Sequence, residues 1–216
     1  MEIKTILLVG SGEDISLIKL KEYSKKSNLI IAVDGGLNHL DSINIIPNII
    51  IGDFDSVNKD VIDKYSNKEK YPNIDIIDFE TDKDLTDYEL ALRHSLTFNS
   101  EEIFMFGSTG SFFDHSLANI ILLTKYSCNT QQLKIITSNS SIYLIQKSST
   151  IERMNGARVS LFPIANIEDI RLEGFQYEFK KSNLSLFDFS ISNIISSDNA
   201  IISFKNGNFL IVLFDI

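Results

Sequence analysis

The pattern of hydrophobic residues changes near residue 130, and this change is the strongest constraint on the fold. Before it, short β-branched runs alternate with stretches of helical periodicity. The predicted strands are Thr5–Val9, Leu29–Val33, Ile49–Ile51, Ile74–Phe79 and Ile103–Phe106, and the predicted helices are 15–26, 61–65, 85–96 and 116–126. Because strands connected through helices run parallel, residues 1–130 are predicted to form an α/β domain with a mostly parallel sheet.

Residues 131–216 contain strand-like runs without a long helical pattern. The runs are Lys134–Thr137, Ser141–Ile145, Ala157–Phe162, Asp169–Leu172, Ala200–Phe204 and Phe209–Phe214. This pattern predicts an all-β domain, a small sandwich. The segment Asn206-Gly207-Asn208 predicts a hairpin between the last two strands, since Asn-Gly readily adopts positive φ. We also expect Asp84 to cap the helix at 85–96.

Composition narrows the classes of partner. The chain has 20 Lys and Arg against 29 Asp and Glu, a formal net charge of −9, and shows no basic patch. Nucleic acid and membrane are therefore not expected as partners. The single cysteine, Cys128, excludes an internal disulfide and a cysteine-based zinc site. The N-terminus does not resemble a signal peptide, and the apolar runs are far shorter than the ~18 residues of a membrane span, so we expect a cytoplasmic protein.

Acidic and glycine-rich segments follow the predicted strands of the first domain. They are Gly10-Ser11-Gly12, Asp34-Gly35-Gly36, Gly52–Ser56, Thr81–Asp87, and Gly107–Gly110 with the following Asp114-His115. Because the carboxyl ends of parallel strands share one edge of a sheet, we expect these segments to converge. Clustered carboxylates repel one another unless a divalent cation neutralises them, and oxygen ligands favour magnesium or manganese. Glycine-rich turns let backbone N–H groups approach a phosphate, so the pattern predicts a site for a metal–nucleotide complex.

Each segment also has a purely structural interpretation. Gly10-Ser11-Gly12 can be a tight turn, and residues 81–87 can be a capped helix start with solvated charges. His115, taken by itself, is more typical of a structural histidine. The functional interpretation therefore depends on the convergence of the segments.

Motif comparisons exclude two common sites. The chain has no Gly-x-x-x-x-Gly-Lys-Ser/Thr, so it is not a P-loop protein. The acidic pair Asp53 and Asp55 does not begin a calcium-binding EF-hand, because Asn58 replaces the required glycine and Lys64 the final glutamate. The pair does resemble the nucleophile loop of haloacid-dehalogenase-type phosphatases, but that loop follows the first strand and this one follows the third.

Taken in order, these segments resemble the thiamine pyrophosphokinase family. In the first domain the matching residues are Asp34–Asn38, Gly52–Ser56, Lys83–Glu89, Gly107–Gly110, Asp114, His115 and Asn119. In the second they are Gly156–Pro163, Gly174–Tyr177 and Ser190–Asn193. The resemblance covers nearly the whole chain, and the segments with Asp53 and Asp55 and with Thr86 and Asp87 are the most specific.

The resemblance implies a fold, an assembly and a reaction. It implies an N-terminal α/β nucleotide domain and a C-terminal β-sandwich in a homodimer with active sites at the interface. The reaction implied is attack of the thiamine hydroxyethyl oxygen on the β-phosphorus of ATP, which gives thiamine diphosphate and AMP and requires Mg²⁺. Two alternatives stay open: a pterin-type pyrophosphokinase on the same scaffold, and a nucleotide-binding protein without catalysis.

The resemblance also implies roles for individual residues. The implied catalytic and metal-holding residues are Asp53, Asp55 and Asp87. The residues implied to bind ATP are Asp34, Gly35, Ser56, Lys83, Thr86, Thr109, Gly110, Asp114, His115 and Asn119, and those implied to bind thiamine are Ser192 and Asn193.

This chain departs from the family pattern at specific positions. Gly110-Ser111-Phe112 stands where members often have Gly-Gly-Arg, which removes one expected contact to phosphate. Gly174-Phe175-Gln176-Tyr177 replaces Gly-Leu-Lys-Tyr. The chain has no tryptophan, so any aromatic stacking on thiamine must come from Phe or Tyr.

Overall fold

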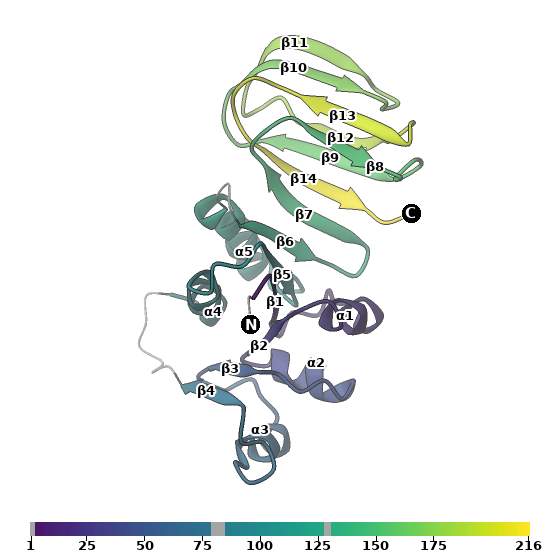
Figure 1. Ribbon diagram of the computed structural model, residues 1–216. Helices are drawn as coiled ribbons and strands as arrows, with labels where there is room; N and C mark the ends of the chain where they lie inside the picture. The colour runs from purple at the N-terminus through teal and green to yellow at the C-terminus, as the bar shows by residue number, and fades with distance from the viewer. Residues whose placement is uncertain (1–2, 79–84, 128–130) are drawn as a thin grey trace. The chain divides into compact units, whose positions relative to one another are not determined.

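The computed structural model describes residues 3–78, 85–127 and 131–216 (Figure 1). The chain divides after Ser138 into two compact units. The first is α/β with a parallel sheet and the second is all-β, as the hydrophobic pattern predicted. The boundary expected between residues 130 and 131 lies before the strand Gln132–Ile136, whereas the observed division lies after it. This strand belongs to the first unit because it pairs with the parallel sheet.

The first unit alternates strands and helices along the chain. Its strands are β1 (Thr5–Val9), β2 (Leu29–Val33), β3 (Ile49–Gly52), β4 (Asp75–Asp78), β5 (Glu102–Phe106) and β6 (Gln132–Ile136). Its helices are α1 (Leu17–Ser24), α2 (Gly36–Ser42), α3 (Lys59–Ser66), α4 (Asp87–Leu96) and α5 (Phe113–Tyr126). The strands pair in parallel in the order β6-β5-β1-β2-β3-β4.

Burial on both faces explains why these strands are continuous apolar runs. In β1, Ile6, Leu7, Leu8 and Val9 are all fully buried. Alternate residues point to opposite faces, and Leu7 and Val9 share a core with α1, α2 and α3. Figure 1 shows α4 and α5 on the other side of the sheet from α1 and α2. The sheet is therefore covered on both faces, and its carboxyl edge is left to the loops.

Two features of the first unit differ from the sequence predictions. Helix α2 begins at Gly36, the last residue of the Asp34-Gly35-Gly36 segment, where no helix was predicted. Helix α4 is capped by Thr86, whose hydroxyl accepts a hydrogen bond from the Glu89 N–H at 3.2 Å. Asp84, the expected cap, lies outside the described residues. A Thr with Glu three residues later is the capping-box pattern, which explains the start of α4.

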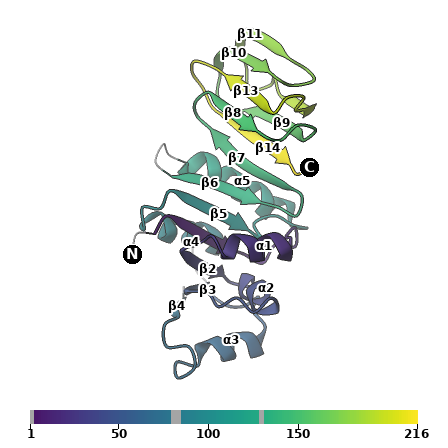
Figure 2. The same cartoon turned by 45° about the vertical axis from the view of Figure 1, so that its right-hand side comes forward.

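The second unit is a sandwich of two antiparallel sheets, drawn as two layers in Figure 2. One has the order β12-β9-β14-β7 and the other β11-β10-β13-β8. The strands are β7 (Ser140–Ile145), β8 (Ser149–Glu152), β9 (Arg158–Pro163), β10 (Ile167–Glu173), β11 (Phe179–Leu184), β12 (Ser190–Ile194), β13 (Asn199–Ser203) and β14 (Phe209–Phe214). Side chains from both sheets form one core, among them Leu161 and Ile211 from one sheet and Leu172 and Ile202 from the other.

The predicted hairpin between the last two strands is wrong. β13 pairs with β10 and β8, whereas β14 pairs with β7 and β9 in the other sheet. Gly207 does adopt a positive φ, of 106°. The neighbouring Asn206 is bound to β10, because its carbonyl accepts from the Glu168 N–H at 3.1 Å and its amide donates to the Glu168 carboxylate at 2.9 Å. The turn therefore carries the chain from one sheet to the other.

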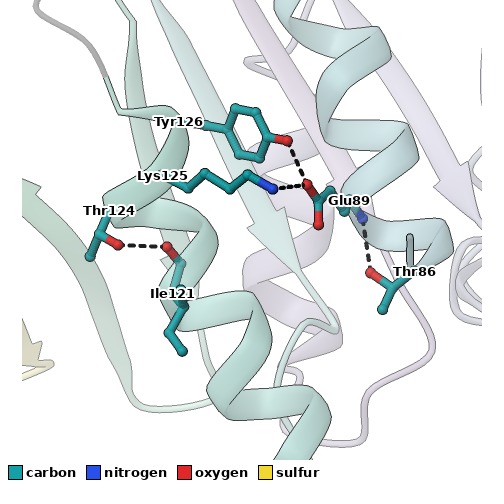
Figure 3. A network of polar contacts seen from close by, with 6 residues as sticks. All are labelled: Thr86, Glu89, Ile121, Thr124, Lys125 and Tyr126. Carbon is teal, nitrogen blue, oxygen red and sulfur yellow. Dashed lines mark hydrogen bonds and ion pairs between the residues drawn. The ribbon is translucent and has the colours of Figure 1, made fainter. Parts of the chain in front are cut away.

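A buried carboxylate connects α4 to α5 (Figure 3). One oxygen of Glu89 accepts hydrogen bonds from the Lys125 ammonium, at 2.6 Å, and from the Tyr126 hydroxyl. The bond from Lys125 is the main cause that lowers the pKa of Glu89, and the bond from Tyr126 adds to it. The ionised carboxylate thereby holds the first turn of α4, with Thr86, against the last turn of α5.

We expect Glu89→Gln to lower the free energy of unfolding by about 1 kcal/mol at pH 7, because the hydrogen bonds lose their charge. Since the folded-state pKa of Glu89 lies below its ordinary value of 4.5, this stabilisation is present above pH ~4.5 and is lost as the pH falls through the folded-state value. Urea unfolding of both proteins between pH 7 and pH 3.5 measures the difference. Glu101→Gln is the control, because Glu101 pairs with Lys4 at 3.6 Å on the surface. A gap between wild type and Glu89→Gln that is independent of pH contradicts the prediction.

Candidate active site

A cavity of about 460 Å³ opens at the carboxyl edge of the parallel sheet. Its lining comes from the loops after β1, β2, β3 and β5 and from the first turns of α4 and α5, as convergence of these segments predicted. The lining residues are Gly10–Glu13, Val33, Asp34, Ser56, Thr86–Tyr88, Gly107–Phe112, His115, Ser116, Ala118 and Asn119. This volume falls within the range of pockets for small ligands and cofactors.

Close contact between the β1 and β5 loops explains two of the glycines. The Gly12 N–H donates to the Gly107 carbonyl at 2.8 Å. A Cβ on Gly12 would lie 2.3 Å from the Thr109 carbonyl oxygen, and one on Gly107 would lie 2.1 Å from that of Gly10. Gly107 also has a φ of +58°, which favours glycine. The two loops therefore pack backbone to backbone beneath the cavity.

The glycine N–H groups are engaged within the protein, which differs from their expected role as phosphate donors. Gly10 and Gly12 donate to carbonyls of the β5 strand and loop. Gly35 donates to the Ser56 hydroxyl at 2.9 Å, and Gly110 to the Ser116 hydroxyl at 3.1 Å. The glycines at these four positions thus shape the loops and do not present free donors to a phosphate.

Three carboxylates meet at one end of the site. Asp34, Asp53 and Asp55 each place an oxygen within 4.8 Å of the others. Positive φ angles at Asp34, 47°, and at Phe54, 64°, turn the β2 and β3 loops toward each other. The Asp34 N–H donates to the Ile51 carbonyl at 2.8 Å, which fixes the end of β2 against β3. A positive φ at a non-glycine residue is uncommon and often accompanies a functional site.

The electrostatics of this group fit a cation. One oxygen of Asp34 accepts a hydrogen bond from the Ser56 hydroxyl, while the other, Oδ1, is buried and has no hydrogen-bond partner. The negative charge of Asp53, followed by that of Asp34, raises the pKa of Asp55. A buried acceptor without a donor and carboxylates that repel one another are both stabilised by a bound cation. An all-oxygen donor set suits a hard divalent ion.

Asp87 lies apart from this group of three. It is the first residue of α4, follows the cap residue Thr86, and lines the cavity with it. Its expected part in holding metal stays a prediction. Lys83, expected to contact phosphate, lies outside the described residues.

The other residues expected to bind ATP divide into two groups. Thr109, Gly110, His115 and Asn119 line the cavity. Asp114, exposed in the first turn of α5, is not among the lining residues. Their roles toward ATP stay predictions.

Two of these lining side chains already have partners within the protein. Asn119 is buried, and its amide donates to the Ser108 carbonyl at 2.8 Å. The Thr109 hydroxyl donates to the Asp14 carboxylate at 3.3 Å. Both bonds stabilise the β5 loop, so these side chains shape the cavity wall.

Sequence reasoning assigned no role in the site to several lining residues, among them Tyr88 and Glu13. Tyr88 follows Asp87, and its buried hydroxyl donates to the Phe106 carbonyl at 3.1 Å. Burial raises the pKa of this phenol well above its usual value, so it stays protonated. Tyr88 lies within the Lys83–Glu89 segment of the family resemblance but was assigned no role there, and Glu13 carries no motif by which it could be found.

Ser192 and Asn193, expected to bind thiamine, lie on β12 of the second unit, at an irregularity in its pairing with β9. Ser192 is exposed and has a φ of 55°. Asn193 is 1% exposed; its side-chain oxygen accepts from the Tyr177 N–H at 3.0 Å, and its amide donates to the Tyr177 carbonyl at 2.9 Å. Asn193 therefore holds the loop before β11 in place, and a contact of either residue with thiamine stays a prediction.

A cavity beside clustered carboxylates, at the carboxyl edge of a parallel sheet, defines a ligand-binding protein of the α/β enzyme class. Two family models match the chain: the catalytic domain of thiamin pyrophosphokinase over residues 20–137, and its vitamin B1 binding domain over residues 145–209. The chain belongs to the thiamin pyrophosphokinase family.

Individual relatives agree with this assignment. A thiamine pyrophosphokinase of Bacillus subtilis is 29% identical over 97% of this chain and 98% of its own length. A crystal structure of thiamine pyrophosphokinase from Bacillus subtilis superposes with a TM-score of 0.86 at 29% identity, covering 98% of this chain and 99% of the other. Thiamin pyrophosphokinase from Candida albicans shares the fold at 20% identity, with a TM-score of 0.81 over 100% of this chain and 90% of the other.

Asn193 and Ser192 form a pair for a stability test. Asn193→Ala should lower the free energy of unfolding by about 1–3 kcal/mol, because it removes a buried side chain and both of its hydrogen bonds to the Tyr177 backbone. Ser192→Ala should stay within about 0.5 kcal/mol, because this side chain is exposed. Denaturant unfolding of the two variants measures the difference. Equal stability of both variants would show that the Asn193 amide does not hold the loop.

Proposed function

We propose that this protein is a thiamine pyrophosphokinase, which transfers the diphosphate group of ATP to the hydroxyethyl group of thiamine and releases AMP. Family membership supports the assignment over nearly the whole chain. The observation that carries it is the group of Asp34, Asp53 and Asp55. Asp34 lines the cavity, which has a size suited to a nucleotide, and the other two carboxylates lie outside the lining but within 4.8 Å of that of Asp34. Phosphoryl-type transfer needs positioning and charge neutralisation more than covalent chemistry, and this arrangement provides for both.

Mg²⁺ is the metal we propose for the site. Asp53 and Asp55 would hold it, with Asp34 completing the group seen in the structure and Asp87 contributing from α4. When bound, the ion neutralises phosphate charge and polarises the phosphoryl group under attack. The unpartnered Oδ1 of Asp34 supports this donor set.

The charge of the cavity supports a metal-complexed nucleotide and a cationic second substrate. Among its described lining residues are the acids Glu13, Asp34 and Asp87, and no lysine or arginine. Such a wall repels free triphosphate and attracts the thiazolium of thiamine, by roughly 1 kcal/mol for each close contact in water. Thr86, Thr109, Gly110 and His115 are proposed to line the nucleotide, and Ser192 is proposed to contact the pyrimidine of thiamine.

The attacking hydroxyl of thiamine is a weak nucleophile, and a carboxylate near it accepts its proton. Asp55 and Asp87 are the two candidates for this base. Asp55 carries the raised pKa described above, and Asp87 stands at the cavity wall outside the group of three.

The assembly and location are further parts of the proposal. We propose a homodimer with active sites at the interface, in the cytoplasm. Exposed apolar side chains in the second unit, among them Phe187, Phe189 and Ile191, support a covered face there. In the part of the chain that the structure describes, no helix is both long and apolar enough to span a membrane.

AMP release with and without thiamine tests the function directly. A thiamine pyrophosphokinase releases AMP only when thiamine is present. A pterin-type enzyme would require a hydroxymethyl-pterin instead, and a nucleotide-binding protein would release no AMP with either alcohol. Neither alternative is supported by the family models that match the chain.

Asp55→Asn should reduce turnover by ~100-fold or more at saturating Mg²⁺, because it removes a metal ligand. In EDTA the same variant should melt no lower than wild type, because one of three mutually repelling charges is gone. Steady-state AMP release and thermal melting measure the two effects. Asp75→Asn is the matched control, because Asp75 is an exposed carboxylate at the start of β4, the end of the strand away from this edge. Near-normal turnover of Asp55→Asn contradicts the metal-ligand role.

A further inference from the structure

An aromatic side chain at the mouth of the cavity has no role in the chemistry described above. Phe112 lines the cavity, yet 73% of it is exposed. The imidazole of His115, in the first turn of α5, lies beside it with ring centroids 5.9 Å apart and an angle of 54° between the planes. We propose that Phe112, with His115 beside it, forms the face on which the nucleobase of the nucleoside triphosphate stacks. This inference rests on the proposed function, because it assigns a second part of the same site.

The backbone holds Phe112 in a fixed place. Its carbonyl accepts hydrogen bonds from the Ser116 N–H, at 3.0 Å, and from the Ser116 hydroxyl, at 2.9 Å. The same hydroxyl accepts from the Gly110 N–H at 3.1 Å. Ser116 is itself buried. The loop that carries the ring is therefore ordered before any ligand binds, which reduces the entropy lost on stacking.

The order of the strands separates Phe112 from the carboxylates by the length of a nucleotide. The carboxylates follow β2 and β3, whereas Phe112 follows β5, and the strand order between them is β3-β2-β1-β5. Three spacings of about 4.8 Å place the loops after β3 and β5 roughly 14 Å apart. A nucleoside triphosphate with its phosphates at the metal group extends across this distance, so its base reaches the Phe112 end.

The chemistry of the two ends agrees with this orientation. Asp34 and Ser56 line the end that suits a cation and the phosphates it carries. At the other end Phe112, His115 and Ala118 offer aromatic and apolar surface. Because Phe112 stands where family members often have an arginine, this position of the present chain offers no cation to a phosphate and suits a base instead. Exposed aromatic rings that face a cavity gain most from stacking, because the planar base covers area that is otherwise in water.

Phe113 provides a matched control on the same turn. It is 76% exposed, close to the 73% of Phe112, but it is not among the residues that line the cavity. We therefore compare Phe112→Ala, Phe112→Leu and Phe113→Ala by calorimetric titration with Mg²⁺-ATP and with Mg²⁺-tripolyphosphate, which lacks a base. Phe112→Ala should weaken ATP binding by about tenfold, with Phe112→Leu weakened less. Both should bind tripolyphosphate within about twofold of wild type, and Phe113→Ala should match wild type for both ligands.

A spectroscopic measurement reports the stacking itself. Because the chain has no tryptophan, Phe112→Trp places a single indole at the site. Its fluorescence should be quenched by Mg²⁺-ATP and left unchanged by Mg²⁺-tripolyphosphate. Quenching by both ligands, or by neither, contradicts a stacked base.

Other outcomes overturn the inference and are distinguishable from a failure of the proposed function. Equal weakening of ATP and tripolyphosphate by Phe112→Ala would show a general effect on the pocket. A rise in the thiamine KM with an unchanged ATP KM would assign the ring to the other substrate, and a change of mass in solution would assign it to an interface. If wild type binds ATP without thiamine-dependent AMP release, the proposed function fails, while the binding comparison still decides the role of Phe112.

Discussion

Mutual repulsion among Asp34, Asp53 and Asp55 is the constraint on which the site depends. The fold holds these carboxylates within 4.8 Å of one another at the cost of two non-glycine residues with positive φ. Repulsion already raises the pKa of Asp55, and one buried oxygen of Asp34 has no hydrogen-bond partner. A bound cation would relieve both the repulsion and the unpartnered oxygen. The parallel sheet, the loops that pack beneath the cavity and the ordered start of α4 can all be understood as the scaffold that maintains it.

The architecture of the first unit was largely predictable from its sequence. Strands such as Thr5–Val9 and Leu29–Val33 are β-branched, bounded by polar residues and buried on both faces, so local pattern and tertiary environment agree. Convergence of the loops followed from the parallel topology. Helix α2 was missed because Gly35-Gly36 favours a turn locally, and burial of Leu37 and Leu40 against the sheet outweighs that preference.

The finer structure of the site lay beyond sequence reasoning. The proximity of Asp34 to Asp53 and Asp55 depends on the positive φ angles of Asp34 and Phe54. The residue type at these two positions is not enough to predict a positive φ. The engagement of the glycine N–H groups depends on long-range partners such as Ser56. In the second unit, Gly207 has the positive φ that the predicted turn requires, but the contact of Asn206 with Glu168 accompanies a turn that joins strands of different sheets.

The backbone packing of Gly12 against the β5 loop has a consequence for how this pocket can vary. Since a methyl group at Gly12 or Gly107 would collide with a carbonyl oxygen, the floor of the cavity tolerates almost no chemical change. The rim around Phe112 and His115 is exposed and carries no such restriction. Adaptation to a different nucleotide, whether by evolution or by engineering, is therefore confined to the rim, while the floor stays constant.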